Sequence, residues 1–174
     1  MSGPASSRPW FCCSLSLAPA LVRERLGGLP EPAVPGGEGA EALDVDLVYD
    51  VAAPEWHGRV ARLVDGPGQR VLGRLRPVPP ALWPQVVALE ERLALASLER
   101  TVRVRTASGA LVTARALTPP APPRAVQAPV SETFLVALAR AAESAKLPAD
   151  YVLRLHAEAR LVQTVQRART ERPR

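Results

Sequence analysis

Alternating apolar and polar positions predict β-strands along the first two thirds of the chain. In the clearest case Leu43, Val45 and Leu47 alternate with Asp44 and Asp46, which is typical of a strand with one buried face. The same alternation, together with a continuous apolar run near the N-terminus, predicts strands over residues 10–15, 43–50, 59–64, 69–76, 101–105 and 111–116. Glycine-containing turns separate the third strand from the fourth and the fifth from the sixth, so each pair is expected to be joined by a turn.

Apolar residues at helical spacing predict four helices, over residues 19–26, 80–95, 132–145 and 149–162. Proline opens the first two of these segments, where the first turn of a helix accepts it, and a glycine pair ends the first. Residues 29–42 are rich in glycine, proline and glutamate and are expected to form a loop. Residues 118–129 contain five prolines and are expected to form a linker without regular structure.

Length and composition are those of a single globular domain. The chain has 174 residues, of which 47% are hydrophobic, 22% charged and only 4% aromatic, so its core must consist mainly of leucine, valine and alanine. We expect a flexible tail over residues 1–8, one domain over 9–166 that includes the proline-rich segment 118–130, and a frayed tail over 167–174. The order of elements predicts an α+β fold with a small mixed sheet and flanking helices.

The basic charge does not by itself indicate a nucleic-acid partner. The net charge is +5, but Lys146 is the only lysine, and a composition so rich in arginine, alanine and proline is typical of a GC-rich genome. Arg70, Arg74 and Arg76 share the polar side of a predicted strand and are expected to form its solvated face. No segment approaches the roughly 20 apolar residues that span a bilayer, so we expect neither nucleic-acid nor membrane partners.

The cysteine pattern argues against a disulfide framework and against a zinc site. Cys12 and Cys13 are adjacent and no second pair exists, which favours a reducing cytoplasm. The alternative is that residues 8–20 form a short signal peptide, because Arg8 precedes an apolar run. No spacing links either cysteine to His57 or His156, so buried, unreactive thiols are expected rather than a cysteine nucleophile.

Helix geometry selects one carboxylate in the segment 80–95. At 100° per residue, Glu90 flanks the apolar side defined by Val86 and Leu89, whereas Glu91 lies nearly opposite. Partial desolvation would raise the pKa of Glu90 toward values that suit proton transfer. The alternative is that both glutamates are solvated helix residues near Arg92.

Several segments match, in order, the motifs of a known family. They are Trp10-Phe11-Cys12-Cys13-Ser14-Leu15, Val71-Leu72-Gly73, Val86 to Glu90, the hairpin around Gly109, Ser131 to Phe134, and Leu147 to Leu155. Over roughly residues 9–160 the chain thereby resembles the gamma-glutamylcyclotransferase-like superfamily. The resemblance implies an α+β fold in which a small mixed sheet or barrel curls around a cavity.

The resemblance also implies a reaction. The substrate's α-amino group attacks its own γ-carbonyl group, which forms 5-oxoproline and expels an amine, while Glu90 transfers the proton. Cys12, Cys13, Ser14 and Leu15 correspond to the turn that holds the substrate, a gamma-glutamyl amine or peptide. The resemblance further implies that no metal or organic cofactor is needed, and we expect a monomer or a homodimer.

The chain departs from the family within the motifs themselves. Cys12-Cys13 replaces the Tyr-Gly pair of the turn, and Leu98 stands where the family has a tyrosine. A glycine in such a turn allows close approach of a ligand or a positive φ, and cysteine provides neither readily. The alternative function is therefore a catalytically inactive relative that binds a small ligand or a protein partner.

Overall fold

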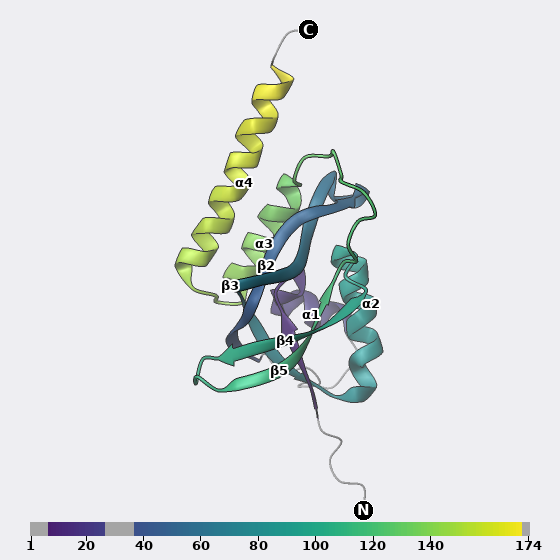
Figure 1. Ribbon diagram of the computed structural model, residues 1–174, viewed down its shortest axis with the longest axis vertical. Coiled ribbons are helices and arrows are strands. Elements are labelled where there is room, and N and C mark those ends of the chain that lie inside the picture. The colour runs from purple at the N-terminus through teal and green to yellow at the C-terminus, as the bar shows by residue number, and fades with distance from the viewer. Residues whose placement is uncertain (1–6, 27–36, 172–174) are drawn as a thin grey trace, which may run out of the picture.

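A closed five-stranded barrel forms the centre of the computed structural model, which describes residues 7–26 and 37–171 (Figure 1). Its strands are β1 (Arg8–Cys12), β2 (Glu38–Ala53), β3 (Gly58–Val78), β4 (Leu98–Thr106) and β5 (Leu111–Thr118). They neighbour one another in the order β1-β3-β2-β4-β5, and parallel pairing of β1 with β5 closes the barrel. The other pairs are antiparallel, so the expected mixed barrel is confirmed.

Four helices accompany the barrel, in the segments where helical spacing predicted them. They are α1 (Pro19–Arg25), α2 (Trp83–Ala94), α3 (Glu132–Ser144) and α4 (Ala149–Thr170). Ser131 caps α3, because its hydroxyl accepts a hydrogen bond from the backbone N–H of Phe134 at 3.0 Å. Short 3₁₀ turns cover Leu15–Leu17, Pro54–Trp56 and Pro80–Leu82. None of the helices in the described ranges is both long and apolar enough to cross a membrane.

Two strand predictions are corrected by the long ribbon of β2 and β3. Residues 59–64 and 69–76 belong to the single strand β3, in which the unpaired residues 66–69 form a bulge opposite Asp44 instead of a connecting turn. Pairing with β2 resumes beyond the bulge because Asp44 adopts a positive φ and its carboxylate accepts a hydrogen bond from the Gly68 N–H at 3.0 Å. The expected loop 29–42 is also shorter, since β2 already begins at Glu38; residues 27–36 lie outside the described part of the chain.

Side chains of β1 and of Cys13, which follows it, divide between two hydrophobic cores. Phe11 and Cys13 point into the barrel, whose core comes from all five strands. Trp10 and Cys12 point the other way and pack with residues of the helices and of the Leu15–Leu17 turn. Both faces of β1 are buried, which explains its continuous apolar run in the sequence.

Arg74 and Arg76 do not form the solvated face that the sequence predicted. Arg76 is 1% exposed, and its guanidinium donates hydrogen bonds to the backbone oxygens of Ser16 at 2.8 Å and Leu17 at 3.2 Å. Arg74 donates to the carbonyl oxygen of Ala145 at 2.8 Å. Segments distant in sequence cover this side of β3. The alternation of polar and apolar residues within one strand carries no information about such distant segments.

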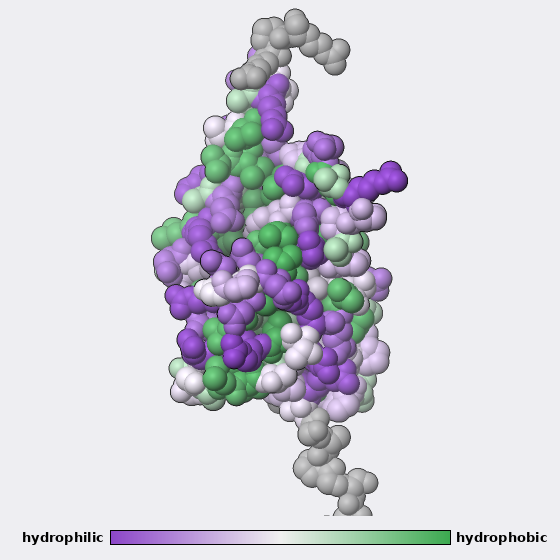
Figure 2. Space-filling view, viewed as in Figure 1, coloured by the Kyte–Doolittle hydropathy of each residue, from purple (hydrophilic) through white to green (hydrophobic). Residues whose placement is uncertain are grey.

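Ion pairs with acidic residues engage many arginines on the outside of the barrel. Arg103 contacts Asp44 at 2.6 Å, and Arg70 and Arg105 both contact Glu41, at 3.2 Å and 2.9 Å. Hydrophilic and hydrophobic residues are correspondingly interspersed over the face seen in Figure 2. The positive charge of these arginines is therefore balanced locally.

The C-terminal helix is longer than the sequence suggested. α4 continues to Thr170, so residues 167–170 are helical rather than frayed, whereas residues 1–6 and 172–174 lie outside the described ranges. Its buried positions are Tyr151, Val152, Leu155 and Ala159, and the part beyond Ala159 is half-buried or exposed. In Figure 1 this last part rises past the end of α3.

Candidate active site

Glu90 lies on the inner side of α2, between that helix and the turn that follows β1. Its side chain is 2% exposed, whereas the neighbouring Glu91 is exposed. Val86 and Leu89 on the same side of α2 are buried too. The burial predicted for Glu90 from helix geometry is thus confirmed.

One oxygen of the Glu90 carboxylate is bound and the other is free. The Ser16 hydroxyl, in the Leu15–Leu17 turn, donates a hydrogen bond to Glu90 Oε1. Ser16 Oγ also lies 2.9 Å from the Cys12 thiol, so three polar side chains form a buried row. Glu90 Oε2 is buried and makes no hydrogen bond to any part of the chain that the structure describes.

Burial raises the pKa of Glu90 to about 7. The hydrogen bond from Ser16 and the positive charge of Arg76 both lower it, but by less than burial raises it. A carboxyl group with this pKa is present in both protonation states near neutral pH. It can therefore accept a proton and return one, as a general base and acid must.

Arg76 is the buried cation of this site. Besides holding the carbonyl groups of Ser16 and Leu17, its guanidinium lies 5.6 Å from the centre of the Trp10 ring. It thus fixes the turn that carries Ser16 and partly compensates the charge of Glu90. Sequence reasoning missed both residues: Ser16 interrupts an apolar pair, a weak signal, and Arg76 resembles every other alternating arginine.

The four turn residues singled out by sequence are split between core and recess. Cys12 and Leu15 are buried in the core on the helix side of β1, whereas Cys13 and Ser14 line a small recess. Cys13 does not adopt a positive φ, so its backbone conformation does not require a glycine.

The recess beside Cys13 and Ser14 is small and mostly apolar. Its free volume is about 10 Å³, enough for roughly one water molecule. Glu90 does not line it, although Ala94 and Ala96, just beyond Glu90 in the chain, do. The other lining residues are Leu47, Ala61, Leu63, Leu117, Thr118 and Pro119.

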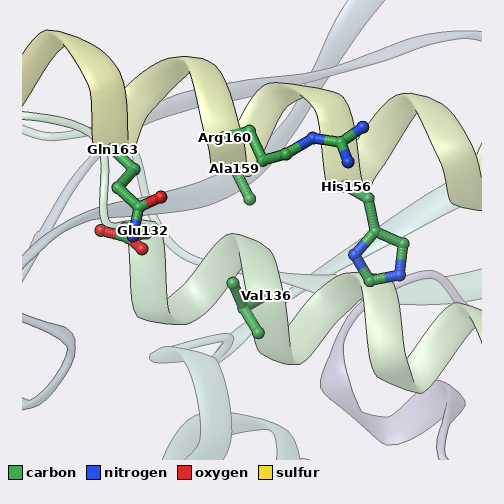
Figure 3. A pocket seen from close by; sticks show the side chains of 6 residues that line it. All are labelled: Glu132, Val136, His156, Ala159, Arg160 and Gln163. Atoms are coloured by element: carbon green, nitrogen blue, oxygen red, sulfur yellow. The ribbon is translucent and has the colours of Figure 1, made fainter.

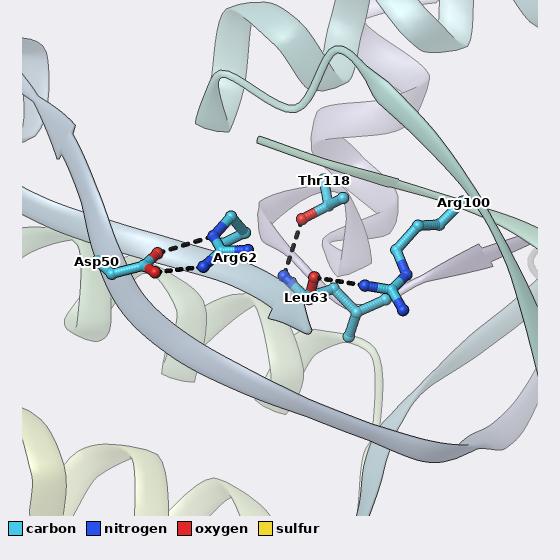
Figure 4. Close-up of polar contacts among 5 residues, drawn as sticks. All are labelled: Asp50, Arg62, Leu63, Arg100 and Thr118. Atoms are coloured by element: carbon cyan, nitrogen blue, oxygen red, sulfur yellow. Dashed lines mark hydrogen bonds and ion pairs between the residues drawn. The ribbon is translucent and has the colours of Figure 1, made fainter. Parts of the chain in front are cut away.

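Side chains hold one wall of the recess in place. The backbone N–H of Leu63 donates to the Thr118 hydroxyl at 2.8 Å, and the Leu63 carbonyl oxygen accepts from Arg100 at 3.0 Å (Figure 4). β3 does not pair with β5 in the barrel, so these backbone groups find side-chain partners instead of a strand. Nearby, Arg62 forms a two-pronged ion pair with Asp50 that links β3 to β2.

Both thiols are buried, as expected. Burial raises the pKa of Cys12 to about 12 and also raises the pKa of Cys13 well above its usual range. His57, after the Pro54–Trp56 turn, and His156, on α4, form no hydrogen bond to either sulfur. Among residues 7–26 and 37–171, no group of three or more His, Cys, Asp or Glu side chains is placed to hold a metal ion.

Comparisons with known proteins identify the fold. No protein-family model and no curated protein sequence matches the chain. Among solved structures, a gamma-glutamyl cyclotransferase shares 20% sequence identity over 87% of each chain, with a TM-score of 0.68. An uncharacterized human protein gives 20% identity and a TM-score of 0.67 over 87% of this chain and 88% of the other. A yeast gamma-glutamyl cyclotransferase specific to glutathione gives 12% sequence identity and a TM-score of 0.58, over 90% of this chain and 97% of the other. The chain therefore has the gamma-glutamylcyclotransferase-like fold.

Proposed function

We propose that this chain converts a gamma-glutamyl amine or peptide into 5-oxoproline and a free amine, with Glu90 as the acid and base. The observation that carries the proposal is the carboxyl group itself, which is buried, has a pKa of about 7 and keeps one oxygen without a partner. Buried polar groups nearly always form hydrogen bonds, so an exception with a shifted pKa suggests a functional site. The cyclotransferases among the structural neighbours support the reaction class.

The proposed reaction needs one group that moves a proton. The α-amino nitrogen of the substrate attacks the γ-carbonyl carbon, so that one C–N bond forms and closes the ring. The C–N bond to the leaving amine then breaks. The Glu90 carboxylate takes the proton that the attacking nitrogen loses and gives it to the departing amine nitrogen.

The turn from Cys12 to Leu15 is proposed to bind the substrate. Backbone N–H groups at the end of a strand can hold the negative charge that develops on the γ-carbonyl oxygen. Because the recess beside Cys13 and Ser14 has a free volume of only about 10 Å³, a substrate has to displace the Cys13 side chain or shift the turn. Ser16 connects this turn directly to Glu90.

Release of 5-oxoproline tests the proposal. Purified protein would be incubated with a panel of gamma-glutamyl amino acids and amines, beside the variants Glu90→Gln and Glu91→Gln. Glu91→Gln is the matched control because it makes the same change at the next, exposed position of α2. We expect turnover by the unaltered protein and by Glu91→Gln, and a fall of about 10²-fold or more in Glu90→Gln. Turnover that survives in Glu90→Gln would contradict the role of Glu90.

The size of the recess favours a second candidate function, which is ligand or partner binding without turnover. In that case Cys13 fills space that a substrate needs. Cys13→Gly separates the candidates, because it restores the residue type of the family turn and enlarges the recess. Absence of turnover in both the unaltered protein and Cys13→Gly would favour binding alone.

A further inference from the structure

A groove between α3 and α4 shares no residue with the Glu90 site. It has a volume of about 260 Å³ and is lined by Glu132, Val136, His156, Ala159, Arg160 and Gln163 (Figure 3). Glu132 and Gln163 also border a second hollow further along α4. The groove is thus a feature of the helix pair and not of the barrel.

Two small apolar side chains form the floor of the groove and polar side chains form its sides. Ala159 is buried where α4 packs on α3, and Val136 is half-buried opposite it. Because both are short, they leave space between the two helices that longer side chains would fill. The lining that remains consists of one carboxylate, one imidazole, one guanidinium and one carboxamide.

These four polar side chains have no partner in the described part of the chain. Glu132, His156, Arg160 and Gln163 take part in no side-chain hydrogen bond and no ion pair there. On the barrel, by contrast, arginines such as Arg103 and Arg105 are paired with carboxylates. Four unpaired polar groups around one groove leave their hydrogen-bonding capacity to a ligand.

The polar groups are arranged by charge. Figure 3 shows Glu132 beside Gln163 at one end, while the guanidinium of Arg160 points toward the ring of His156 at the other. Glu132 comes from the first turn of α3 and the other three from α4. Opposite charges that line one groove without contacting each other produce an electrostatic field. This field is complementary to a molecule that carries one positive and one negative group.

We propose that this groove binds a small zwitterion, either a free amino acid or a short peptide. The ligand carboxylate is bound by the guanidinium of Arg160, which can donate two parallel hydrogen bonds, with His156 beside it. The ligand ammonium group donates to the Glu132 carboxylate and to the amide oxygen of Gln163. A volume of about 260 Å³ suits a ligand below drug size. The proposal does not depend on the activity proposed for Glu90.

The two histidines allow a direct test by nuclear magnetic resonance. His156 lies in the groove and His57 lies after the Pro54–Trp56 turn, so the imidazole signals of His57 serve as an internal control. Glycine, diglycine and triglycine would each be titrated into the full chain. We expect saturable shifts of the His156 signals, with affinity in about the millimolar range, and unmoved His57 signals. The probe that binds best tells whether a free amino acid or a peptide is preferred.

Single-charge probes and charge-removing variants complete the test. Acetate and methylammonium carry one charge each and should bind at least about tenfold more weakly than the best zwitterion. Arg160→Gln and Glu132→Gln should each weaken binding by about tenfold, and Arg154→Gln, at an exposed arginine of α4 outside the groove, should not. Absence of His156 shifts with every probe would overturn the proposal, as would acetate binding equal to that of glycine or unchanged binding in Arg160→Gln.

Discussion

The Glu90 cluster and the α3–α4 groove place charged side chains in opposite environments. Glu90 and Arg76 are almost fully buried, and their neighbours fix them with hydrogen bonds. Glu132 is half-buried and Arg160 exposed, and neither has a partner in the described ranges. Burial shifts the pKa of a charged group and makes its protonation affect the stability of the fold. An exposed charged group keeps its hydrogen-bonding capacity for a ligand, and removing it costs the fold little. The two sites should therefore respond differently to substitution.

The largest effect is expected from removal of the buried cation. Arg76→Met leaves the carbonyl groups of Ser16 and Leu17 without their donor and leaves Glu90 without a compensating charge. We expect the free energy of unfolding to fall by about 3–5 kcal/mol, measured by urea denaturation. Arg70→Met is the matched control on the same strand, because its exposed ion pair with Glu41 is worth at most about 1 kcal/mol. Equal losses in the two variants would contradict the structural role of Arg76.

A somewhat smaller effect is expected from pH. The pKa of Glu90 is about 7 in the folded protein and has its ordinary value of 4.5 when unfolded. Between these values the folded state binds more protons, so this group makes stability fall as pH rises from about 4.5 to about 7, by roughly 3 kcal/mol in total. Denaturation at a series of pH values measures this fall. The slope should largely disappear in Glu90→Gln, and an unchanged slope would assign the effect to other groups.

The smallest effect is expected in the groove. Glu132→Gln and Arg160→Gln remove charges that form no side-chain hydrogen bond or ion pair within the described part of the chain, so each should change the free energy of unfolding by less than about 0.5 kcal/mol. Thermal melting would measure this. A loss comparable to that of Arg76→Met would mean that these groups support the fold, and the contrast between the two sites would fail.

Local pattern was a reliable guide where one element decides the outcome. Helical spacing placed Glu90 on the buried side of α2 because the direction of a side chain follows from its position in the helix. It could not show that β3 continues through the bulge at residues 66–69, since the Gly68 N–H in this bulge donates its hydrogen bond to Asp44 on another strand. The ligand role of the Cys12–Leu15 turn stays a prediction.

Apart from the division of β3, the sequence by itself determined the order of strands and helices, the apolar faces of the elements and the position of Glu90 beside the apolar side of its helix. These depend on periodicity and chain stiffness, which act between near neighbours. Only the tertiary structure decided that Arg76 is buried, that Ser16 binds Glu90, and that the recess beside Cys13 is small. Each of these depends on which distant segment covers a residue, and burial is a property of the packed molecule rather than of the residue.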